Sequence, residues 1–420
     1  MRIVLCNKYF FLNGGTEKYL HDMLESLRAG GHDPIPFSVR YAGSWPSSYE
    51  HYFLPPPGAP DQAHFRNIQL ASTSWLRLLD RSIYSLEARR YLARLTGAVG
   101  PIDVAYLLNI YNYMSPSLIH TFRGRGIPVV VRLGDYHLLC PSYNFLRAGA
   151  PCTLCLGGGY RHGLQYRCVH GSFAASALRV LSMYVHRWLR IYRHVGAFVV
   201  PCRFMKGKLV AGGFPSNRIH LIRTPVVSPH RPAALPKGNY ILYFGRISFE
   251  KGLDTLIEAY QRILPPVELV FIGRSYDGER ERLERLLHPE AAGRIRFLDF
   301  MTGEALSPWI AQALFTVVPS RWYDNAPISI YESYLHGTPV LASRIGGIPE
   351  QVQEGVTGRL FTPDSAGDLA ESIRWLLGDR DRLLQMGRAG RALVLRDYSM
   401  EEHLERLLEL FAGLVRDAKG

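Results

Sequence analysis

The sequence contains no acidic residue between Asp135 and Glu250. This gap belongs to a wider imbalance, because residues 1–225 hold 26 Lys and Arg against 10 Asp and Glu, whereas residues 226–420 hold 23 against 26. An arginine-rich proteome alone would not make only one half of the chain basic. We therefore expect an anionic partner for the first half: a membrane surface, a phosphate-bearing acceptor or a nucleic acid.

Long apolar runs and cysteine are also scarce. No window approaches the ~18 consecutive apolar residues of a membrane-spanning helix, and the apolar start at Met1–Leu5 is too short for a signal peptide. Six cysteines in 420 residues exclude a disulfide scaffold. The aromatic residues form no recognisable RNA-binding motif. We therefore expect a cytoplasmic protein that binds no nucleic acid. We also expect two domains, because 420 residues exceed what one hydrophobic core usually supports.

The chain opens with a predicted strand, a glycine turn and a helix. Apolar residues at Ile3–Leu5 are followed by Gly14 and Gly15, and then by an amphipathic pattern that runs to Ala29. The three spaced glycines of the dinucleotide fingerprint are absent. A double glycine either lets backbone amides approach a ligand closely or makes a tight structural turn, and the sequence leaves both readings open.

A second stretch, Val317–Phe361, combines a strand, an irregular loop, a short helix and a second strand that leads to a double glycine. In an open parallel sheet such loops gather at the carboxyl ends of the strands, where ligands bind. The unpaired amides at the start of the helix, near Ile328 and Ser329, favour an anion. The other residues of interest in this stretch are Asp324, Asn325, Glu332, Gly346 and Gly347.

A third stretch, Tyr240–Gly252, leaves a strand through Gly245 and enters a helix. Arg246 and Lys251 lie at this strand-to-helix turn. A departing diphosphate builds negative charge, and preorganised cations aimed at that charge stabilise the transition state. Arg offers a planar fork of donors and Lys a point charge, so the two together suit such a group.

These residues resemble the donor-sugar site of the family-4 retaining glycosyltransferases. In that family a Pro-Ser and a Glu-x7-Glu precede G-x-P-V and Gly-Gly-x-x-Glu, and a Gly-Arg-x4-Lys-Gly turn opens the same domain. Here the second glutamate is Glu332, the first is replaced by Asp324, and the tail is Gly346–Glu350. The Gly-Arg-x4-Lys-Gly turn is Gly245–Gly252.

The resemblance implies a role for each of these residues. Arg246 and Lys251 would bind the donor diphosphate, Glu332 would accept hydrogen bonds from the ribose, and Asp324, one methylene shorter than glutamate, would face the sugar. No cofactor would be required for catalysis. The remaining donor contacts would come from Gly14 and Gly15 across the cleft, from Gly273 and Arg274 at the end of the next strand beside the nucleobase, and from Asn325, Ile328 and Ser329.

Another apolar strand, Pro128–Leu133, ends at Gly134, Asp135 and His137. Family members commonly carry a His-Asp pair at this strand end, with the histidine facing the anomeric carbon of the sugar. By that alignment Gly134 occupies the histidine position and Asp135 the aspartate position, and His137 follows two places on. The resemblance makes Asp135 and His137 candidate catalytic residues.

Four of the six cysteines fall within 29 residues, and polar and glycine residues surround them. We therefore expect an inserted loop at 136–171 rather than a packed element. Four thiols around a central Cys-x2-Cys suit a structural zinc ion, with free thiols or one oxidised pair as the alternatives. The candidate zinc ligands are Cys140, Cys152, Cys155 and Cys168.

The stretch Ser172–Tyr192 has the pattern of a long basic amphipathic helix. Such a helix can lie in a membrane interface, where its arginines meet lipid phosphates. The alternative is an ordinary helix that packs on the sheet. The first reading predicts peripheral association with the inner face of the cell membrane through the basic first half of the chain.

The family resemblance implies the GT-B architecture, an α/β fold in which two Rossmann-like domains with parallel sheets face a central cleft. We expect a first domain at 1–225 and a second, nucleotide-sugar-binding domain at 226–395, joined through a proline-rich linker at 225–238. The helical pattern at 396–420 predicts a C-terminal helix that crosses back to the first domain.

The implied activity is transfer of a sugar, with retention of anomeric configuration, from a UDP- or GDP-type donor to a hydroxyl of a glycan or lipid-linked acceptor. The basic first domain suggests a phosphate-linked acceptor at a membrane, as in cell-envelope polysaccharide synthesis. Two alternatives use the same architecture: a sugar-nucleotide epimerase, which needs no acceptor, and a non-catalytic protein that binds nucleotide sugars.

Overall fold

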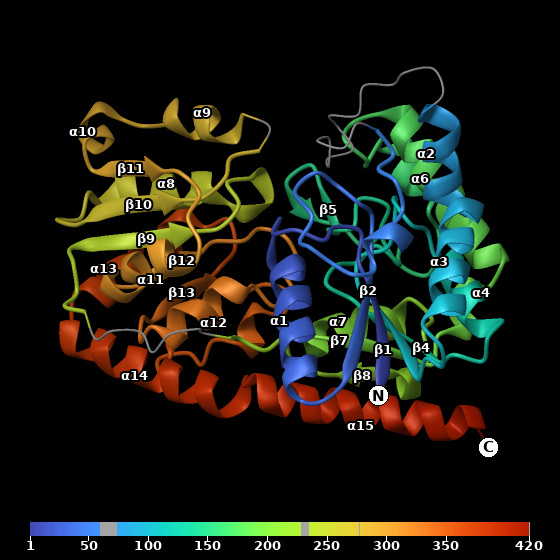
Figure 1. Ribbon diagram of the computed structural model, residues 1–420. Helices are drawn as coiled ribbons and strands as arrows, with labels where there is room; N and C mark the ends of the chain where they lie inside the picture. Colours follow the sequence, from blue (N-terminus) through green and yellow to red (C-terminus); the bar gives the residue numbers. More distant parts are fainter. Residues whose placement is uncertain (59–73, 228–234, 277, 420) are drawn as a thin grey trace.

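The computed structural model describes residues 1–58, 74–227, 235–276 and 278–419, and consists of two α/β domains side by side (Figure 1). Each domain is built on a six-stranded sheet in which every strand pair is parallel. The structure thus confirms the predicted fold class of two parallel-sheet domains. Residues 228–234 of the predicted linker lie outside the described residues.

The strands of the first sheet are short apolar runs, as expected for parallel strands that are covered on both faces. In spatial order they are β2 (Asp33–Phe37), β1 (Arg2–Cys6), β3 (Val104–Leu107), β4 (Val129–Arg132), β7 (Ala197–Val200) and β8 (Ile219–Leu221). The main helices of this domain are α1 (Gly15–Ala29), α2 (Ser74–Ile83), α3 (Leu86–Ala98), α4 (Ser117–Arg123), α6 (Phe173–Trp188) and α7 (Arg203–Ala211).

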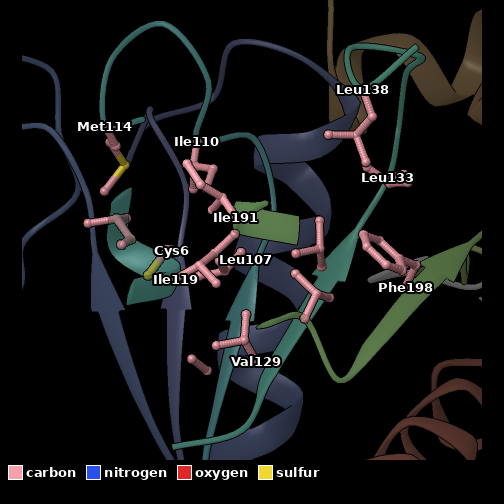
Figure 2. Packing of buried hydrophobic residues seen from close by; sticks show 14 of the residues in the cluster. Cys6, Leu107, Ile110, Met114, Ile119, Val129, Leu133, Leu138, Ile191 and Phe198 are labelled. Atoms are coloured by element: carbon pink, nitrogen blue, oxygen red, sulfur yellow. The ribbon is translucent and has the colours of Figure 1, made fainter. Parts of the chain in front are cut away.

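One face of the first sheet carries an extensive apolar layer, part of which is drawn in Figure 2. Strand residues such as Leu107 and Val129 meet Ile119 of α4 and Ile191 of the 3-10 turn η3 (Ile191–His194). Leu138, in the segment after β4, and Phe198 of β7 belong to the same layer. The layer therefore supports the loop that follows β4 as well as the strands.

The opposite face of the first sheet is covered by α1 and by the last helix of the chain, α15 (Met400–Lys419). Leu407 and Phe411 of α15 belong to the same buried cluster as Met23 of α1. Figure 1 shows α15 lying along the first domain, although it follows the second domain in sequence. His403 of α15 is hydrogen-bonded through Nε2 to the Tyr19 hydroxyl at 2.8 Å.

The second sheet has the same parallel form. In spatial order its strands are β11 (Ile295–Leu298), β10 (Glu268–Ile272), β9 (Tyr240–Phe244), β12 (Thr316–Val318), β13 (Val340–Ser343) and β14 (Gly358–Phe361). Its helices are α8 (Leu253–Ile263), α9 (Glu279–Glu284), α10 (Pro289–Ala292), α11 (Gly303–Gln312), α12 (Ile328–Leu335), α13 (Ala366–Leu377) and α14 (Arg380–Asp397). In both sheets the first strand of the domain lies inside the sheet, so the strand order reverses beside it, which is where ligands bind in open α/β sheets.

The cysteine-rich segment 136–171 differs from the unpacked loop expected from its sequence. It contains a two-stranded hairpin of β5 (Leu146–Arg147) and β6 (Ala150–Pro151) and a short helix, α5 (Arg161–Gln165). The side chain of Phe145 is 1% exposed within the core of the first domain. Tyr160 packs with Val180 and Met183 of α6. Aromatic residues therefore anchor a segment whose composition suggested a free loop.

The predicted helix at Ser172–Tyr192 is interrupted near its end. α6 stops at Trp188, and Arg190 adopts a left-handed conformation with φ of 51° before η3 begins. In the described part of the chain, no helix is both long and apolar enough to cross a bilayer.

Candidate active site

The carboxyl ends of the two sheets meet across an interface between the domains. The Asn325 side-chain amide, after β12, donates a hydrogen bond of 2.8 Å to the carbonyl oxygen of Gly134, after β4. A Cβ atom on Gly15, at the start of α1, would lie 2.8 Å from Cδ1 of Ile328, at the start of α12. The missing side chain of Gly15 therefore lets the amino ends of two helices, one from each domain, come together.

An ion pair within the second domain lies next to this contact, because Asp324 directly precedes Asn325. The ammonium group of Lys251 is 2.6 Å from Oδ2 of Asp324, and the Ser320 hydroxyl donates to the same oxygen at 2.9 Å. The side chains of Lys251 and Asp324 are 16% and 9% exposed. The sequence predicted both residues as donor contacts, and the structure brings them together from loops 73 residues apart in the chain.

The loop that carries Lys251 is fixed by a glycine that no other residue can replace without strain. Gly252 has φ of 66°, and a Cβ atom there would lie 2.2 Å from the carbonyl oxygen of Pro319. This close approach presses the loop after β9 against the end of β12. Arg321 adds a second restraint, because its guanidinium pairs with Asp254 of α8 and, at 3.0 Å, with Asp364.

The double glycine after β13 supports the same site from the other side. Cβ atoms on Gly346 and Gly347 would lie 2.3 Å from the carbonyl oxygen of Asp324 and 1.8 Å from that of Asn325. The amide of Gly347 donates to the Asp324 carbonyl at 2.7 Å. The two glycines therefore position the backbone of Asp324 and Asn325.

Glu350, the last residue of the Gly-Gly-x-x-Glu tail, joins the two domains. Its carboxylate accepts hydrogen bonds from the amides of Arg203 and Phe204 at 2.8 and 2.7 Å. These amides belong to the first turn of α7, where no intrahelical partner is available and the helix dipole favours an anion. Glu350 therefore holds the second domain against the first.

Arg246 lies at the more open edge of the interface. Its side chain is 49% exposed and pairs with Glu250 at 3.2 Å. It interacts electrostatically with Asp324 and with Tyr143 of the cysteine-rich segment. Arg246 is thus close enough to the Lys251–Asp324 pair to act on the same ligand.

Gly273 and Arg274 lie beside the Arg246 loop, and their place beside a nucleobase stays a prediction. A Cβ atom on Gly273 would be 1.8 Å from the Gly245 carbonyl oxygen, and the amide of Ile247 donates to the Arg274 carbonyl at 2.9 Å. The guanidinium of Arg274 is exposed and lies 5.0 Å from the ring centroid of Phe300. An exposed cation over an exposed ring forms an edge on which a flat group can stack.

Glu332 belongs to α12 but points toward α1 of the first domain. Burial raises the pKa of its carboxyl group, the positive charge of Lys18 opposes that rise, and Asp22 adds to it. No interaction joins Glu332 to Lys251 or Arg246 among those seen for the described residues. The candidate site therefore has two parts around α12: the Lys251–Asp324 ion pair before the helix and the Glu332 carboxyl group one turn into it.

Asp135 and His137 form a compact hydrogen-bonded unit just after β4. His137 Nδ1 lies 2.7 Å from Asp135 Oδ1, and the Tyr111 hydroxyl donates to Asp135 Oδ2 at 2.5 Å. Burial tends to raise the pKa of Asp135, but the charge of His137 and the hydrogen bonds from His137 and Tyr111 hold it below its ordinary value. The Asp135 carboxyl group therefore stays in its charged form, which can interact with cations or hydrogen-bond donors.

Sequence reasoning missed the groups that surround this unit. The ammonium of Lys8 lies 4.4 Å from the Tyr111 ring centroid, and burial lowers its pKa against the opposing charge of Asp135. Arg179 of α6 donates to the His137 carbonyl oxygen at 2.6 Å. Lys8, Tyr111 and Arg179 come from three separate parts of the chain. The only sign of this cluster in the sequence was the position of Lys8 directly after a strand.

The four cysteines of the predicted zinc site line one small space together with His162. Burial raises the pKa of the Cys155 thiol to about 12, and the proximity of the other three thiols adds to the rise. Within residues 1–58, 74–227, 235–276 and 278–419, however, no three His, Cys, Asp or Glu side chains are arranged as a metal site. The donor set fits a soft tetrahedral ion, and the zinc site stays a prediction.

Two family models match the chain. The model described as "Glycosyl transferase 4-like domain" matches residues 14–225, and the model described as "Glycosyl transferases group 1" matches residues 229–393. The first covers the domain that contains Asp135 and His137, and the second covers the domain that contains Arg246, Lys251, Asp324 and Glu332.

Curated relatives match over part of their length. A sulfoquinovosyl transferase of Arabidopsis thaliana is 34% identical over 160 residues, which are 37% of this chain and 30% of that protein. An alpha-maltose-1-phosphate synthase of Mycolicibacterium smegmatis is 29% identical over 182 residues, 41% of this chain and 47% of that protein. The matched stretches thus span about a third to a half of these relatives.

Solved structures of other proteins share the fold over nearly the whole chain. Sucrose-phosphate synthase from Thermosynechococcus elongatus superposes with a TM-score of 0.71 at 19% identity, covering 99% of both chains. The Anabaena protein HepE in complex with UDP gives a TM-score of 0.66 at 16% identity, covering 98% of this chain and 100% of that one. Family matches to both domains and this shared architecture agree: the chain belongs to the family-4 glycosyltransferases of the GT-B fold.

Proposed function

We propose that the protein transfers a sugar, with retention of anomeric configuration, from a nucleotide-sugar donor of the UDP or GDP type to an acceptor hydroxyl. The observation that carries this proposal is the 2.6 Å contact between Lys251 and Asp324, next to Arg246, at the junction of the two domains. Two cations that converge at the end of a parallel sheet suit a diphosphate, and a carboxylate beside them suits the sugar that it carries.

The residues would divide the chemistry as follows. The bond between the anomeric carbon and the diphosphate oxygen breaks, and Arg246 and Lys251 neutralise the charge that develops on the leaving group. A bond to the acceptor oxygen forms on the same face of the sugar, and the acceptor proton passes to the leaving diphosphate oxygen. Asp324 is the partner of Lys251 in the structure, so a bound diphosphate would compete with it for that ammonium group.

Contacts between the domains would limit the access of water to this chemistry. Asn325 to Gly134, Glu350 to α7, and the approach of Gly15 to Ile328 all hold the domains together around the ion pair. Excluding water from a closed site prevents hydrolysis of the donor and keeps the electrostatic contacts in the site strong. Asp135 and His137 lie next to the Gly134 contact, on the side from which an acceptor would approach.

The proposal has three further features. The Anabaena protein has been solved with UDP and with UDP-glucose, which favours a uridine donor here. The strongly basic first domain favours a glycan or lipid-linked acceptor at the inner face of a membrane, in cell-envelope polysaccharide synthesis. The four thiols around one space favour a structural zinc ion bound by Cys140, Cys152, Cys155 and Cys168.

The central test measures donor binding and turnover for Arg246→Ala, Lys251→Ala and a matched exposed variant, Arg262→Ala in α8. We expect each of the first two to lower turnover by about 10²-fold or more, as for other preorganised charge contacts, while Arg262→Ala stays near the wild type. Full activity of the Arg246→Ala, Lys251→Ala double variant would contradict the proposal.

The products of the same reactions separate the alternatives. Proton NMR of the new glycosidic linkage reports whether the configuration is retained, and an inverted product would refute the retaining mechanism. Release of an altered free sugar without any acceptor would identify an epimerase, and donor binding without turnover in the presence of glycan and lipid-linked acceptors would identify a binding protein.

Metal analysis of protein purified without added zinc tests the cysteine site, and a stoichiometry near zero would reject it.

A further inference from the structure

The first domain contains a cavity of about 650 Å³ that none of the donor-site residues lines. It lies between α6, η3 and the connection from α7 to β8, with Phe198 of β7 in its wall. His137 and Leu138, which lie two and three residues after Asp135, form part of its lining. The cavity therefore reaches the segment that carries the candidate catalytic carboxylate.

Five arginines line this cavity, and no acidic residue does. No ion pair to a carboxylate is formed by any of the five, as far as the structure describes the chain, because the acidic gap between Asp135 and Glu250 removes every local partner. The arginines are Arg179, Arg187, Arg190, Arg193 and Arg218. Uncompensated guanidinium groups around a cavity form a site for a phosphate-type anion.

Three of these arginines donate hydrogen bonds to backbone carbonyl oxygens, among them Arg187, which donates to the Gly157 carbonyl at 3.0 Å. Arg179 is 8% exposed and donates to the His137 carbonyl, and Arg218 donates to the Arg193 carbonyl at 3.0 Å. Arg190 and Arg193 are exposed. The buried donor Arg179 and the exposed donors Arg190 and Arg193 together suit an anionic group that enters from solvent.

Apart from two histidines and two glycines, the remaining walls of the cavity are apolar or aromatic. They are formed by Leu138, Tyr160, Met183, Tyr192, Phe198 and Phe214. A bare inorganic anion would leave this surface without a partner, whereas an apolar chain attached to the anion would cover it at a gain of about 25 cal/mol per Å². The lining therefore selects an amphiphile rather than a free phosphate.

The outer face of α6, beside the cavity mouth, is itself apolar. Phe173, Leu181, Tyr184 and Trp188 recur at helical spacing, with exposed fractions of 59%, 52%, 40% and 80%. Arg187 and Arg190 flank the end of this stripe. An exposed apolar helix face next to basic residues complements an anionic bilayer surface, so the cavity opens where a lipid would leave the bilayer.

We propose that this cavity binds the phosphate or diphosphate group of a lipid-linked acceptor, with α6 resting on the membrane. The proposal rests on the proposed glycosyl transfer and names its acceptor class. The arginines hold the anionic group, the aromatic walls hold the first part of the lipid chain, and the sugar hydroxyl attached to the anion is directed past His137 and Asp135 toward the donor.

The first experiment measures binding of a soluble alkyl diphosphate of 10 to 15 carbons by calorimetry, with the matching alcohol and inorganic diphosphate as comparisons. We expect the Arg190→Gln, Arg193→Gln double variant to bind the alkyl diphosphate at least about tenfold more weakly, from the loss of two charge-assisted contacts. Arg90→Gln, which removes a charge from exposed α3, is the control and should bind like the wild type. Unchanged affinity in the double variant, or equal binding of the alcohol or of inorganic diphosphate, would overturn the proposal.

The second experiment separates a lipid-linked acceptor from a bilayer headgroup. Vesicles of phosphatidylglycerol should bind the wild type more tightly than Trp188→Ser, and that variant should keep the affinity for the soluble alkyl diphosphate. If the vesicles alone displace the alkyl diphosphate from the cavity, the ligand is a headgroup and the acceptor assignment is wrong. Donor hydrolysis, which the double variant should retain, reports on the proposed function independently of the cavity.

Discussion

The two domains share one architecture but differ in how their functional ends are built. In the second domain the loops are fixed by backbone contacts, such as Gly252 against Pro319 and Gly346 against Asp324. In the first domain the corresponding end carries an added cysteine-rich segment and lies beside an arginine-lined cavity of about 650 Å³. One half is close-packed around a small charged group, and the other leaves room for a larger ligand.

This difference matches what the two halves of a transfer reaction require. A donor diphosphate has a fixed shape, and its transition state gains most from groups that need not move. An acceptor varies in size and must enter and leave in every cycle. The charge follows the same division, since the first half of the chain is strongly basic and the second is nearly balanced.

The largest effect is expected from breaking the rigid half. Gly252→Ala places a Cβ atom against the Pro319 carbonyl in a left-handed conformation, which should lower the free energy of unfolding by more than about 2 kcal/mol and abolish donor binding. Gly293→Ala in the same domain, where nothing lies within 4 Å of the added atom, should be close to neutral. Urea unfolding of both variants checks this, and equal stability would show that the loop is not held as described.

A smaller effect is expected where α15 braces the first domain. Burial lowers the pKa of His403 to about 3, so the folded state rejects a proton that the unfolded chain takes up below pH 6.5 or so. Stability from this group is present above that pH and is lost as the pH falls, by up to about 1.4 kcal/mol per pH unit.

Urea unfolding at pH 7.5 and 5.5 measures this loss. His403→Gln should reduce the difference between the two pH values by roughly 1 kcal/mol, and His51→Gln on the surface should leave it unchanged. If the free energy of unfolding changes equally between the two pH values in wild type and His403→Gln, then His403 does not contribute to the packing of α15 as described.

The smallest effect concerns the contact between the halves at Glu332. Because burial raises the pKa of this carboxyl and Lys18 opposes the rise, Lys18→Met should raise the pKa further. Glu332, which would accept hydrogen bonds from the ribose hydroxyls, then becomes protonated at a higher pH. Donor affinity near pH 5.5 should fall by about threefold, which is less than the tenfold change that a shift of one pKa unit can produce. Lys206→Met on α7 is the control. Calorimetry from pH 5 to 8 measures donor affinity for the wild type and both variants. The same affinities in all three proteins would show that Glu332 does not contact the donor.

Much of the second domain could be predicted from its sequence because the signals there are local. Arg246 and Lys251 share one turn, and Asp324 and Glu332 lie eight residues apart. Short apolar strands between glycine turns made the parallel sheets predictable in both domains. The ion pair between Lys251 and Asp324 was not predicted, because it depends on β9 and β12 lying side by side in the sheet.

The first domain was less predictable because its site is assembled from distant elements. Arg179 reaches His137 from 42 residues away, and nothing in its own helix distinguishes it from other arginines. Phe145 packs into the core from a segment whose glycines and polar residues suggested a free loop. The cavity depends on the break after α6 at Arg190, which the continuous helical pattern to Tyr192 concealed.

The most direct test of the central claim is a crystal structure of the protein with UDP. The account predicts that the diphosphate lies between Arg246 and Lys251, that the Lys251 ammonium leaves Asp324 for a phosphate oxygen, and that the hydrogen bond from Asn325 to Gly134 persists. A nucleotide bound elsewhere, with the Lys251–Asp324 pair still intact, would contradict it.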